Sequence, residues 1–428
     1  MLQELLRIDT SNPPGRETPA AMLLKQYLET AGLECELVAR TPERANLICR
    51  IAGSGGGPSL ALLGHTDVVP ATEPDWTHPP FSGHVDEEGY VWGRGATDMK
   101  NETATRAVTM AILARSGFRP NGDLVFVAQA DEEDGTEKVG LQWLRDERPD
   151  LAVDYSIDEG GGSRLELADG RVVISLNVGE KATLPVIVWA EGVARHASVP
   201  TRENNSILVL GEVIKRIAAY TPRRRLLPET RRLLETLVGP FEDADLESAI
   251  EKAGKLHTDF GDDFAAIFST TIAQTRLHGS RARNVIPARA GVECDCRVLP
   301  GTGPADLQQE LEEAIGDLPV HLEFLEPPTG GTSSPVGTPL FEACQSFFDE
   351  RDPGAKLLPK ISSGFTDSHF MRERFGTVAY GIWPFRSTPL GIMDEGVHNV
   401  NERVKVDDLV YATRFHLHVV RRVGAFTS

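Results

Sequence analysis

The first 180 residues alternate between short apolar runs and stretches with helical spacing. Apolar residues recur at helical intervals over 19–32, and the segment 101–117 reads as a helix with small residues that stops at a glycine. Strand-like apolar runs occupy 45–53, 59–64, 89–95, 123–129 and 153–162. Strands that alternate with helices are typical of α/β domains, so we predict a mainly parallel sheet with helices on both faces.

The pattern changes near residue 180, where 182–192 alternates like a strand with one exposed face. Two helices are then predicted, at about 205–220 and within 229–254. A strand, a helix and a strand follow at 290–301, 305–316 and 320–327. This order predicts a smaller α+β domain over 180–328, inserted into a discontinuous domain of residues 1–179 and 329–428.

The charge and cysteine content limit the possible partners and location. The 428 residues carry a formal net charge of −19, which argues against nucleic acid or an anionic membrane as a partner. No apolar run reaches the roughly 20 residues that cross a bilayer, and we recognise no signal peptide at the start. Five scattered cysteines favour reduced thiols and a cytoplasmic location: Cys35, Cys49, Cys294, Cys296 and Cys344.

Polar residues with metal-binding chemistry follow several apolar runs. His65 and Asp67 lie two apart, so they point the same way if the strand extends to them. Ligands of α/β sheets bind beyond the carboxyl ends of the strands. The further candidates are Asp98, Glu132, Glu133, Asp158, Glu159 and His398. Imidazole and carboxylate without cysteine suit Zn²⁺, Co²⁺ or Mn²⁺, and two ions sharing one carboxylate need about five ligands.

Each of these features is weak evidence by itself. A His-x-Asp pair often occurs by chance, and adjacent glutamates usually belong to a solvated surface. A glycosidase with two catalytic carboxylates, such as Glu132 and Asp98, is a different class of enzyme to consider. It leaves His65 and His398 without a role, so the joint placement of the candidates favours a metal site.

Several motifs match a known family in order and spacing. They are "LLRIDTSNPPGRE", "GHTDVVP", "GRGATDMK", "DEEDG", "DEGGG", "HASVP", "ARNVIP", "FTDSHF" and "HNVNERV". On these motifs the chain resembles the M20 metallopeptidases, the group of aminoacylase, carboxypeptidase G2 and succinyl-diaminopimelate desuccinylase. The resemblance covers nearly the whole chain and implies a metal-binding catalytic domain with an inserted lid or dimerisation domain.

The resemblance implies a role for each candidate near the metals. Asp67 would orient the ring of a metal-binding histidine, and Glu132 would be the general base. The implied metal ligands are His65, Asp98 as the bridge between two ions, Glu133, His398 and either Asp158 or Glu159. The choice between the last two acids stays open.

The resemblance also implies residues that contact the substrate. His196 would stabilise the oxyanion, acting in its own subunit or in the neighbouring subunit of a homodimer. Asn284 and Gly364 would contact the substrate, and Arg297 would clamp a carboxylate or tie down the inserted domain. The family's usual glycine before this histidine is Arg195 here, which leaves the local turn open.

We therefore predict a hydrolase with two Zn²⁺ per subunit, with Co²⁺ or Mn²⁺ as alternatives. Its substrate would be a small peptide or an N-acyl amino acid. Metal-activated water would attack the amide carbonyl, and Glu132 would take its proton and pass it to the leaving amine. The alternative is a catalytically inactive relative that binds a metal or ligand on the same scaffold, although every expected position is filled.

Overall fold

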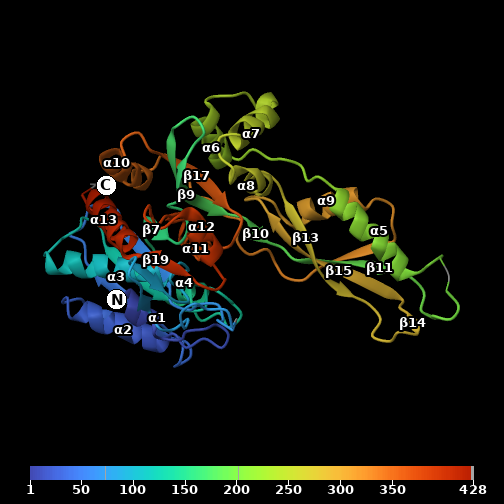
Figure 1. The fold of residues 1–428 in the computed structure, drawn as a ribbon, viewed down its shortest axis with the longest axis horizontal. Coiled ribbons are helices and arrows are strands. Elements are labelled where there is room, and N and C mark those ends of the chain that lie inside the picture. The colour runs from blue at the N-terminus through green and yellow to red at the C-terminus, as the bar shows by residue number, and fades with distance from the viewer. Residues whose placement is uncertain (73, 201, 426–428) are drawn as a thin grey trace. The chain divides into compact units, whose positions relative to one another are not determined.

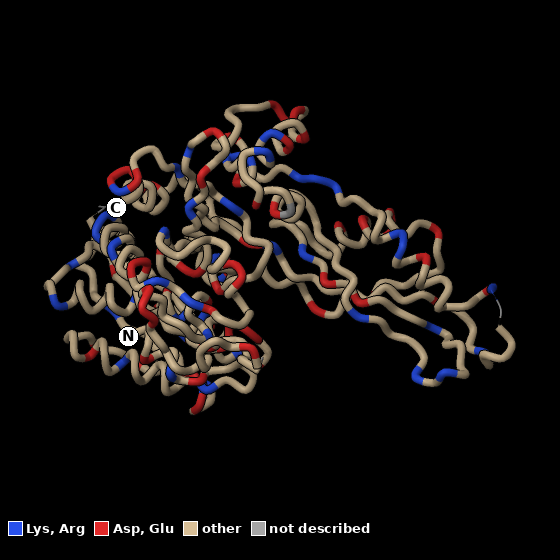
Figure 2. Tube along the Cα trace, viewed as in Figure 1, with Lys and Arg blue, Asp and Glu red and all other residues tan. Residues whose placement is uncertain are grey.

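The computed structural model describes residues 1–72, 74–200 and 202–425 and divides into two compact units (Figure 1). The first unit comprises Met1–Val178, Ser334–Lys360 and Thr366–Ser428. The second comprises Gly179–Ser333 and the short return segment Ile361–Phe365, which the sequence did not indicate. Acidic and basic residues are interspersed along the trace of both units (Figure 2).

A nine-stranded sheet forms the centre of the first unit. Its order is β1 (Cys35–Ala39), β2 (Ala45–Ile51), β6 (Leu124–Gln129), β3 (Leu60–His65), β7 (Tyr155–Asp158), β18 (Val378–Gly381), β9 (Val172–Glu180) and β17 (Lys356–Ser362), with β8 (Arg164–Glu166) beside β9. The central strands β6, β3, β7 and β18 are parallel. Every residue of β3 and β6 is buried, as expected for strands covered on both faces. The predicted α/β class is confirmed.

Helices cover this sheet and place the ends of its strands. The central helix α3 packs on β3 and β6 and contacts α1, α2 and α13, while α11 packs on β7 and β18 and contacts α4. The helices of the first unit are α1 (Leu2–Leu6), α2 (Thr18–Glu29), α3 (Lys100–Arg115), α4 (Leu141–Glu147), η1 (Pro149–Leu151), α10 (Pro339–Arg351), α11 (Ser368–Phe375), α12 (Leu390–Gly396) and α13 (Val406–Val423). None of the described helices combines the length and apolar character that crossing a membrane requires.

One strand that we expected in the parallel sheet belongs to a separate antiparallel sheet. The predicted strand at 89–95 is only β5 (Tyr90–Trp92), which pairs with β4 (His84–Val85) and β19 (Arg403–Lys405). Gly93 and Gly95 have φ values of 155° and 88°, so the chain leaves the strand there and turns toward α3. Asp98 therefore lies in a glycine-rich turn and not at the end of a parallel strand.

The second unit contains its own five-stranded sheet and core. Its strands are β10 (Ala182–Thr183), β11 (Val186–Glu191), β13 (Thr271–His278), β15 (Arg289–Val298) and β16 (Val320–Phe324), with a two-stranded sheet of β12 (Arg195–His196) and β14 (Val285–Ile286). Val186, Val188 and Ala190 alternate into a core shared with α5 (Ser206–Ala219) and α9 (Pro304–Ile315).

The helical segment of the second unit differs from the prediction. The region 229–254 contains α6 (Pro228–Val238) and α7 (Leu246–Gly254) with η2 (Asp243–Asp245) between them, and α8 (Phe260–Ile267) follows. The break comes at Gly239, which has a φ of 81° and is followed by Pro240. A glycine in this conformation ends a helix, and a proline after it prevents the helix from continuing.

The expectation of reduced thiols is wrong for one pair of cysteines. Cys35 and Cys49 form a disulfide, and their Cα atoms lie 4.4 Å apart. They are direct partners in the antiparallel register of β1 and β2, a spacing that allows the bond. The remaining cysteines, Cys294, Cys296 and Cys344, are free and buried. The cytoplasmic location stays a prediction.

A substitution at Gly64 tests how closely α3 packs on β3, the strand that ends at His65. A Cβ at this position would lie 2.5 Å from Oγ1 of Thr103, whose hydroxyl donates to the carbonyl of His65. We expect Gly64→Ala to lower the free energy of unfolding by about 1–3 kcal/mol, because it overpacks this contact.

The matched control is Gly211→Ala, an exposed position within α5 where a Cβ meets no atom within 4 Å. Alanine is favoured over glycine inside helices, so this variant should be neutral or more stable by up to about 1 kcal/mol. Urea unfolding measures both variants. Equal midpoints for the two would contradict the packing described.

Candidate metal centre

The site begins at the carboxyl end of β3, where His65 and Asp67 are both fully buried. The Nδ1 atom of His65 lies 3.0 Å from the backbone oxygen of Asp67 and 3.5 Å from its Oδ1. With a proton on Nδ1, the ring would present Nε2 as a free lone pair on its other side. Asp67 therefore lies against the Nδ1 side of the His65 ring, and its implied role of orienting that ring stays a prediction.

Asp67 also connects this strand end to the loop that follows β6. Its carboxylate accepts hydrogen bonds from the backbone N–H groups of Glu132, at 3.3 Å, and Glu133, at 3.1 Å. Asn12 donates from Nδ2 to Asp67, at 2.9 Å, and to Asp131, at 3.1 Å. The two ends of adjacent parallel strands are thus fixed to each other through one buried carboxylate.

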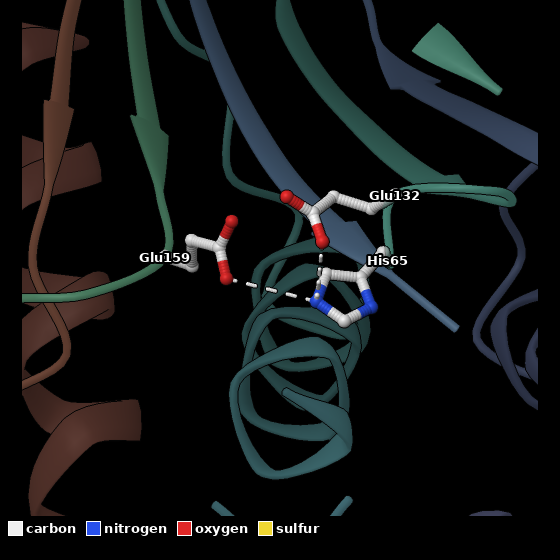
Figure 3. Close-up of side chains that lie close together, drawn as sticks. All are labelled: His65, Glu132 and Glu159. Carbon is white, nitrogen blue, oxygen red and sulfur yellow. Dashed lines mark ion pairs between the residues drawn. The ribbon is translucent and has the colours of Figure 1, made fainter. Parts of the chain in front are cut away.

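Three carboxylates surround Nε2 of His65. The distances from Nε2 are 3.3 Å to Oδ1 of Asp98, 3.6 Å to Oε2 of Glu159 and 3.8 Å to Oε2 of Glu132. Figure 3 shows Glu132 and Glu159 directed at the ring from separate loops. Among the described residues, this buried nitrogen has no hydrogen-bond partner.

A second group forms around His398, which has a φ of 57° in the loop after α12. Its Nε2 lies 3.0 Å from Oε2 of Glu133 and 3.2 Å from Oδ2 of Asp98. One oxygen of Asp98 therefore faces His65 and the other faces His398. The carboxylate occupies the position of a bridge between two groups of potential ligands.

These distances fit ligands that share divalent ions. Two ligands that each lie about 2.0–2.1 Å from a tetrahedral Zn²⁺ are about 3.3 Å apart. The ligand atoms of His65, Asp98 and Glu133 all lie within 4.8 Å of one another, as do those of His65, Glu132 and Glu159. A buried imidazole nitrogen without a hydrogen-bond partner among the described residues, facing several carboxylates, is a donor set that could hold a divalent metal ion.

The adjacent glutamates Glu132 and Glu133 point to different histidines. Glu133 faces His398, whereas Glu132 faces His65. Burial, followed by the carboxylate of Glu159, raises the pKa of Glu132 well above its usual value. Burial also raises the pKa of Glu133, so what distinguishes the two glutamates is the histidine that each one faces.

The two acids at the end of β7 also differ. Glu159 lies near His65, and burial raises its pKa to about 7. Asp158 is buried and its Oδ2 accepts a hydrogen bond from the hydroxyl of Ser368 at 3.0 Å. The nearby Asp367 has a pKa well above its usual value because of burial and the carboxylate of Asp158. Glu159 is therefore the acid that the geometry favours as a ligand.

The remaining predicted site residues belong to the second unit. His196 is exposed, and its Nδ1 lies 2.7 Å from Oγ of Ser198. The carbonyl of Asn284 accepts from the N–H of Ala197, so these residues adjoin the β12–β14 pair. Gly364 is exposed in the return segment.

Arg297 is held within its own sheet. Its Nε and Nη2 donate to the carboxylate of Asp295, at 2.7 and 3.1 Å, and its Nη1 donates to Oγ1 of Thr183 at 2.9 Å. All of these contacts lie within the second unit, so both predicted roles, clamping a carboxylate and tying down the inserted domain, stay predictions.

Sequence reasoning missed several buried polar residues that support the cluster. Besides Asn12, they are Arg44 with Glu17, Arg94 with Glu402, and Arg106 with Glu102. Charged residues in a helix or loop usually face solvent, so nothing in their pattern distinguishes them. The one available signal is that α3 carries charged residues without an apolar stripe and yet must cover the sheet.

Comparisons with known proteins identify the family of the chain. Residues 61–422 match the model of peptidase family M20/M25/M40, so the chain belongs to that family. A succinyl-diaminopimelate desuccinylase of Paracoccus denitrificans is 27% identical over 96% of this chain and 94% of that protein. A probable carboxypeptidase S-like protein of Dictyostelium discoideum is 27% identical over 86% of this chain and 72% of that protein.

Solved structures share the fold. An M20 family metallo-carboxypeptidase of Sulfolobus solfataricus superposes with a TM-score of 0.72 at 19% identity, covering 99% of this chain and 98% of that one. A dinuclear metal-binding M20 peptidase of Bacillus subtilis has a TM-score of 0.64 at 15% identity, covering 100% and 97%. The predicted family is confirmed, and the chain is a hydrolase of amide bonds.

Metal binding at this cluster should depend steeply on pH. The carboxylates of Asp98 and Glu133 raise the pKa of His398 to about 10. A metal ion must displace that proton, so affinity should rise about tenfold per pH unit for each proton released between pH 7 and 9. Competition with a chelator at several pH values measures this. A pH-independent affinity would contradict the arrangement around His398.

Proposed function

We propose that this protein is a dinuclear zinc-dependent hydrolase that cleaves the amide bond of a small peptide or an N-acyl amino acid. The observation that carries the proposal is the position of Asp98, with one carboxylate oxygen toward His65 and the other toward His398. In support, a structural neighbour is named a dinuclear metal-binding peptidase.

Five side chains would hold the two ions. His65, Asp98 and Glu159 would hold the first ion, and Asp98, Glu133 and His398 would hold the second. Bound divalent ions would polarise the substrate carbonyl and lower the pKa of the attacking water. Zn²⁺ suits this set of nitrogen and oxygen ligands, and Co²⁺ or Mn²⁺ would also fit.

Glu132 would move the proton in this reaction. Its carboxylate is buried beside His65, and burial together with the carboxylate of Glu159 raises its pKa, which makes it a stronger proton acceptor than an exposed glutamate. Glu132 takes a proton from the attacking water and delivers it to the leaving amine. Asp67 keeps the ring of His65 oriented throughout, through the contacts at Nδ1.

The names of the relatives support the substrate class. They include desuccinylases, a carboxypeptidase S-like protein and, at 25% identity over 87% of this chain and 76% of that protein, a mouse N-fatty-acyl-amino acid synthase/hydrolase. All of these names describe an amide formed on the nitrogen of an amino acid. We therefore place the substrate among N-acylated amino acids and small peptides.

The second unit would act as the substrate-binding lid in this proposal. We assign residues 1–179 and 329–428 to catalysis and 180–328 to the lid or to dimerisation. His196 would stabilise the oxyanion, in its own subunit or across a homodimer. The groups that contact the substrate would be Asn284, Arg297 and Gly364.

Replacing Glu132 separates proton transfer from metal binding. We expect Glu132→Gln to lower kcat about 10²- to 10⁴-fold, because the amide cannot accept the proton of water. Elemental analysis should still find two metal ions per chain. Glu147→Gln, an exposed position in α4, is the matched control and should keep full activity. Full activity in Glu132→Gln would contradict the assignment.

Metal removal tests the reaction class directly. Dialysis against a chelator should abolish hydrolysis of an N-acyl amino acid, and either Zn²⁺ or Co²⁺ should restore it, because the bound ions would activate the water and polarise the carbonyl. The measurement is activity against metal content. Hydrolysis that persists in metal-depleted protein would refute the proposal.

A further inference from the structure

Two buried arginine–glutamate pairs lie beside the candidate ligands. Arg106 and Glu102 are one turn apart on α3, and Nη2 of Arg106 lies 2.7 Å from Oε2 of Glu102. Arg94 and Glu402 are each 1% exposed and pair across the loops that precede Asp98 and follow His398. None of these four side chains belongs to either group of potential ligands.

The first pair joins two strand ends where the sheet opens. The parallel ladder between β3 and β7 ends at Leu62 and Ile157. Beyond that point the guanidinium of Arg106 donates from Nη1 to the carbonyl of Leu63 and from Nη2 to the carbonyl of Asp158, at 2.8 Å. Arg106 thus connects β3 and β7 beyond the last residue pair of their backbone ladder.

Glu102 completes this connection on the β7 side. Its carboxylate accepts from Nη2 of Arg106, and the same nitrogen holds the carbonyl of Asp158. The residue that follows this anchored carbonyl is Glu159. His65 lies two residues beyond Leu63, so one buried pair fixes both strand ends that carry ligands of the first ion.

The second pair connects the other two loops in the same way. Glu402 accepts from the backbone N–H of Gly95 at 2.8 Å and from the N–H and hydroxyl of Thr97, each at 3.2 Å. Arg94 donates from Nη1 to the carbonyl of Asn399 at 2.9 Å. Thr97 precedes Asp98 and Asn399 follows His398, so this pair fixes the backbone on either side of the second group.

Stability alone is a weak reason for such pairs. Taking both charges out of water costs several kcal/mol per ion, and packed apolar residues of similar volume are often as stable or more so. A guanidinium has donors at fixed angles, which apolar side chains lack, and it can hold two carbonyls at a set separation. Arg106 uses that property on the carbonyls of Leu63 and Asp158, and Arg94 uses it on the carbonyls of Asn399 and, at 3.4 Å, Pro70.

We propose that Arg106–Glu102 and Arg94–Glu402 are positioning pairs, each setting the affinity of one metal ion by fixing the separation of its ligands. This inference rests on the proposed function. Asp98 would bind both ions. Each pair would therefore affect the affinity of one ion selectively through a ligand that binds only that ion. This ligand is Glu159 for the first ion and His398 for the second.

The test is a titration of the metal-free full chain with Co²⁺, followed by its visible absorption, and with Zn²⁺ in competition with a chelator. His65→Ala and His398→Ala serve as references, because each removes one binding step and identifies it. Each test variant removes one ion pair. Methionine replaces the arginine, and glutamine replaces the glutamate so that an oxygen acceptor remains. The variants are Arg106→Met with Glu102→Gln, and Arg94→Met with Glu402→Gln.

We expect the first double variant to weaken the step that His65→Ala removes by about 10- to 100-fold, while the other step changes by less than about threefold. The second double variant should weaken the step that His398→Ala removes by a similar factor. Each variant is therefore the matched control of the other, since both lose one buried pair from the same unit.

The outcomes separate the possible roles. Equal weakening of both steps in each variant, together with a lower unfolding midpoint of the metal-free protein, would show a merely structural role and overturn the inference. Unchanged steps would overturn it as well. A wild-type chain that binds no metal would overturn the proposed function and this inference together.

Conservative variants keep the test decisive if a double variant fails to fold. Arg106→Lys and Arg94→Lys retain the charge beside each glutamate but lack the planar fork that holds two carbonyls. We expect the same selectivity between the two steps, with a smaller loss of affinity. Lysine variants that bind both ions with wild-type affinity would refute the positioning role.

Discussion

The candidate site depends on the carboxylate of Asp98, which lies between two imidazoles that come from distant parts of the chain. Its two oxygens are 3.3 Å from Nε2 of His65 and 3.2 Å from Nε2 of His398. Although burial favours its neutral form, the histidines hold its pKa below the usual value. An ionised carboxylate offers one oxygen to each side, so the rest of the site is arranged around this bridge.

The carboxylates packed around Asp98 repel one another, and bound divalent ions would offset this repulsion. Burial and neighbouring carboxylates raise the pKa values of Glu132, Glu133 and Glu159, because several negative charges share a desolvated space. Cations at the two positions would stabilise the ionised forms and occupy the lone pair on His65. The same repulsion explains why the supporting arginines are buried close to the cluster.

Much of the site could be predicted because its residues follow apolar runs in the sequence. His65 is the last residue of the buried strand β3 and Glu159 directly follows β7, so their positions follow from the strand pattern. Asp98 was placed on the wrong sheet, because a short strand before a glycine turn looks like any other apolar run. The Cys35–Cys49 bond and the Arg106 contacts depend on the register between distant segments, which no local pattern contains.

The most direct test of the account is X-ray diffraction from crystals of the zinc-loaded protein, measured at the zinc absorption edge. The account predicts two anomalous peaks about 3.5–4 Å apart, one beside His65 and one beside His398, with the carboxylate of Asp98 between them. A single peak, or two peaks that do not share Asp98, would contradict the bridged centre on which the proposed chemistry rests.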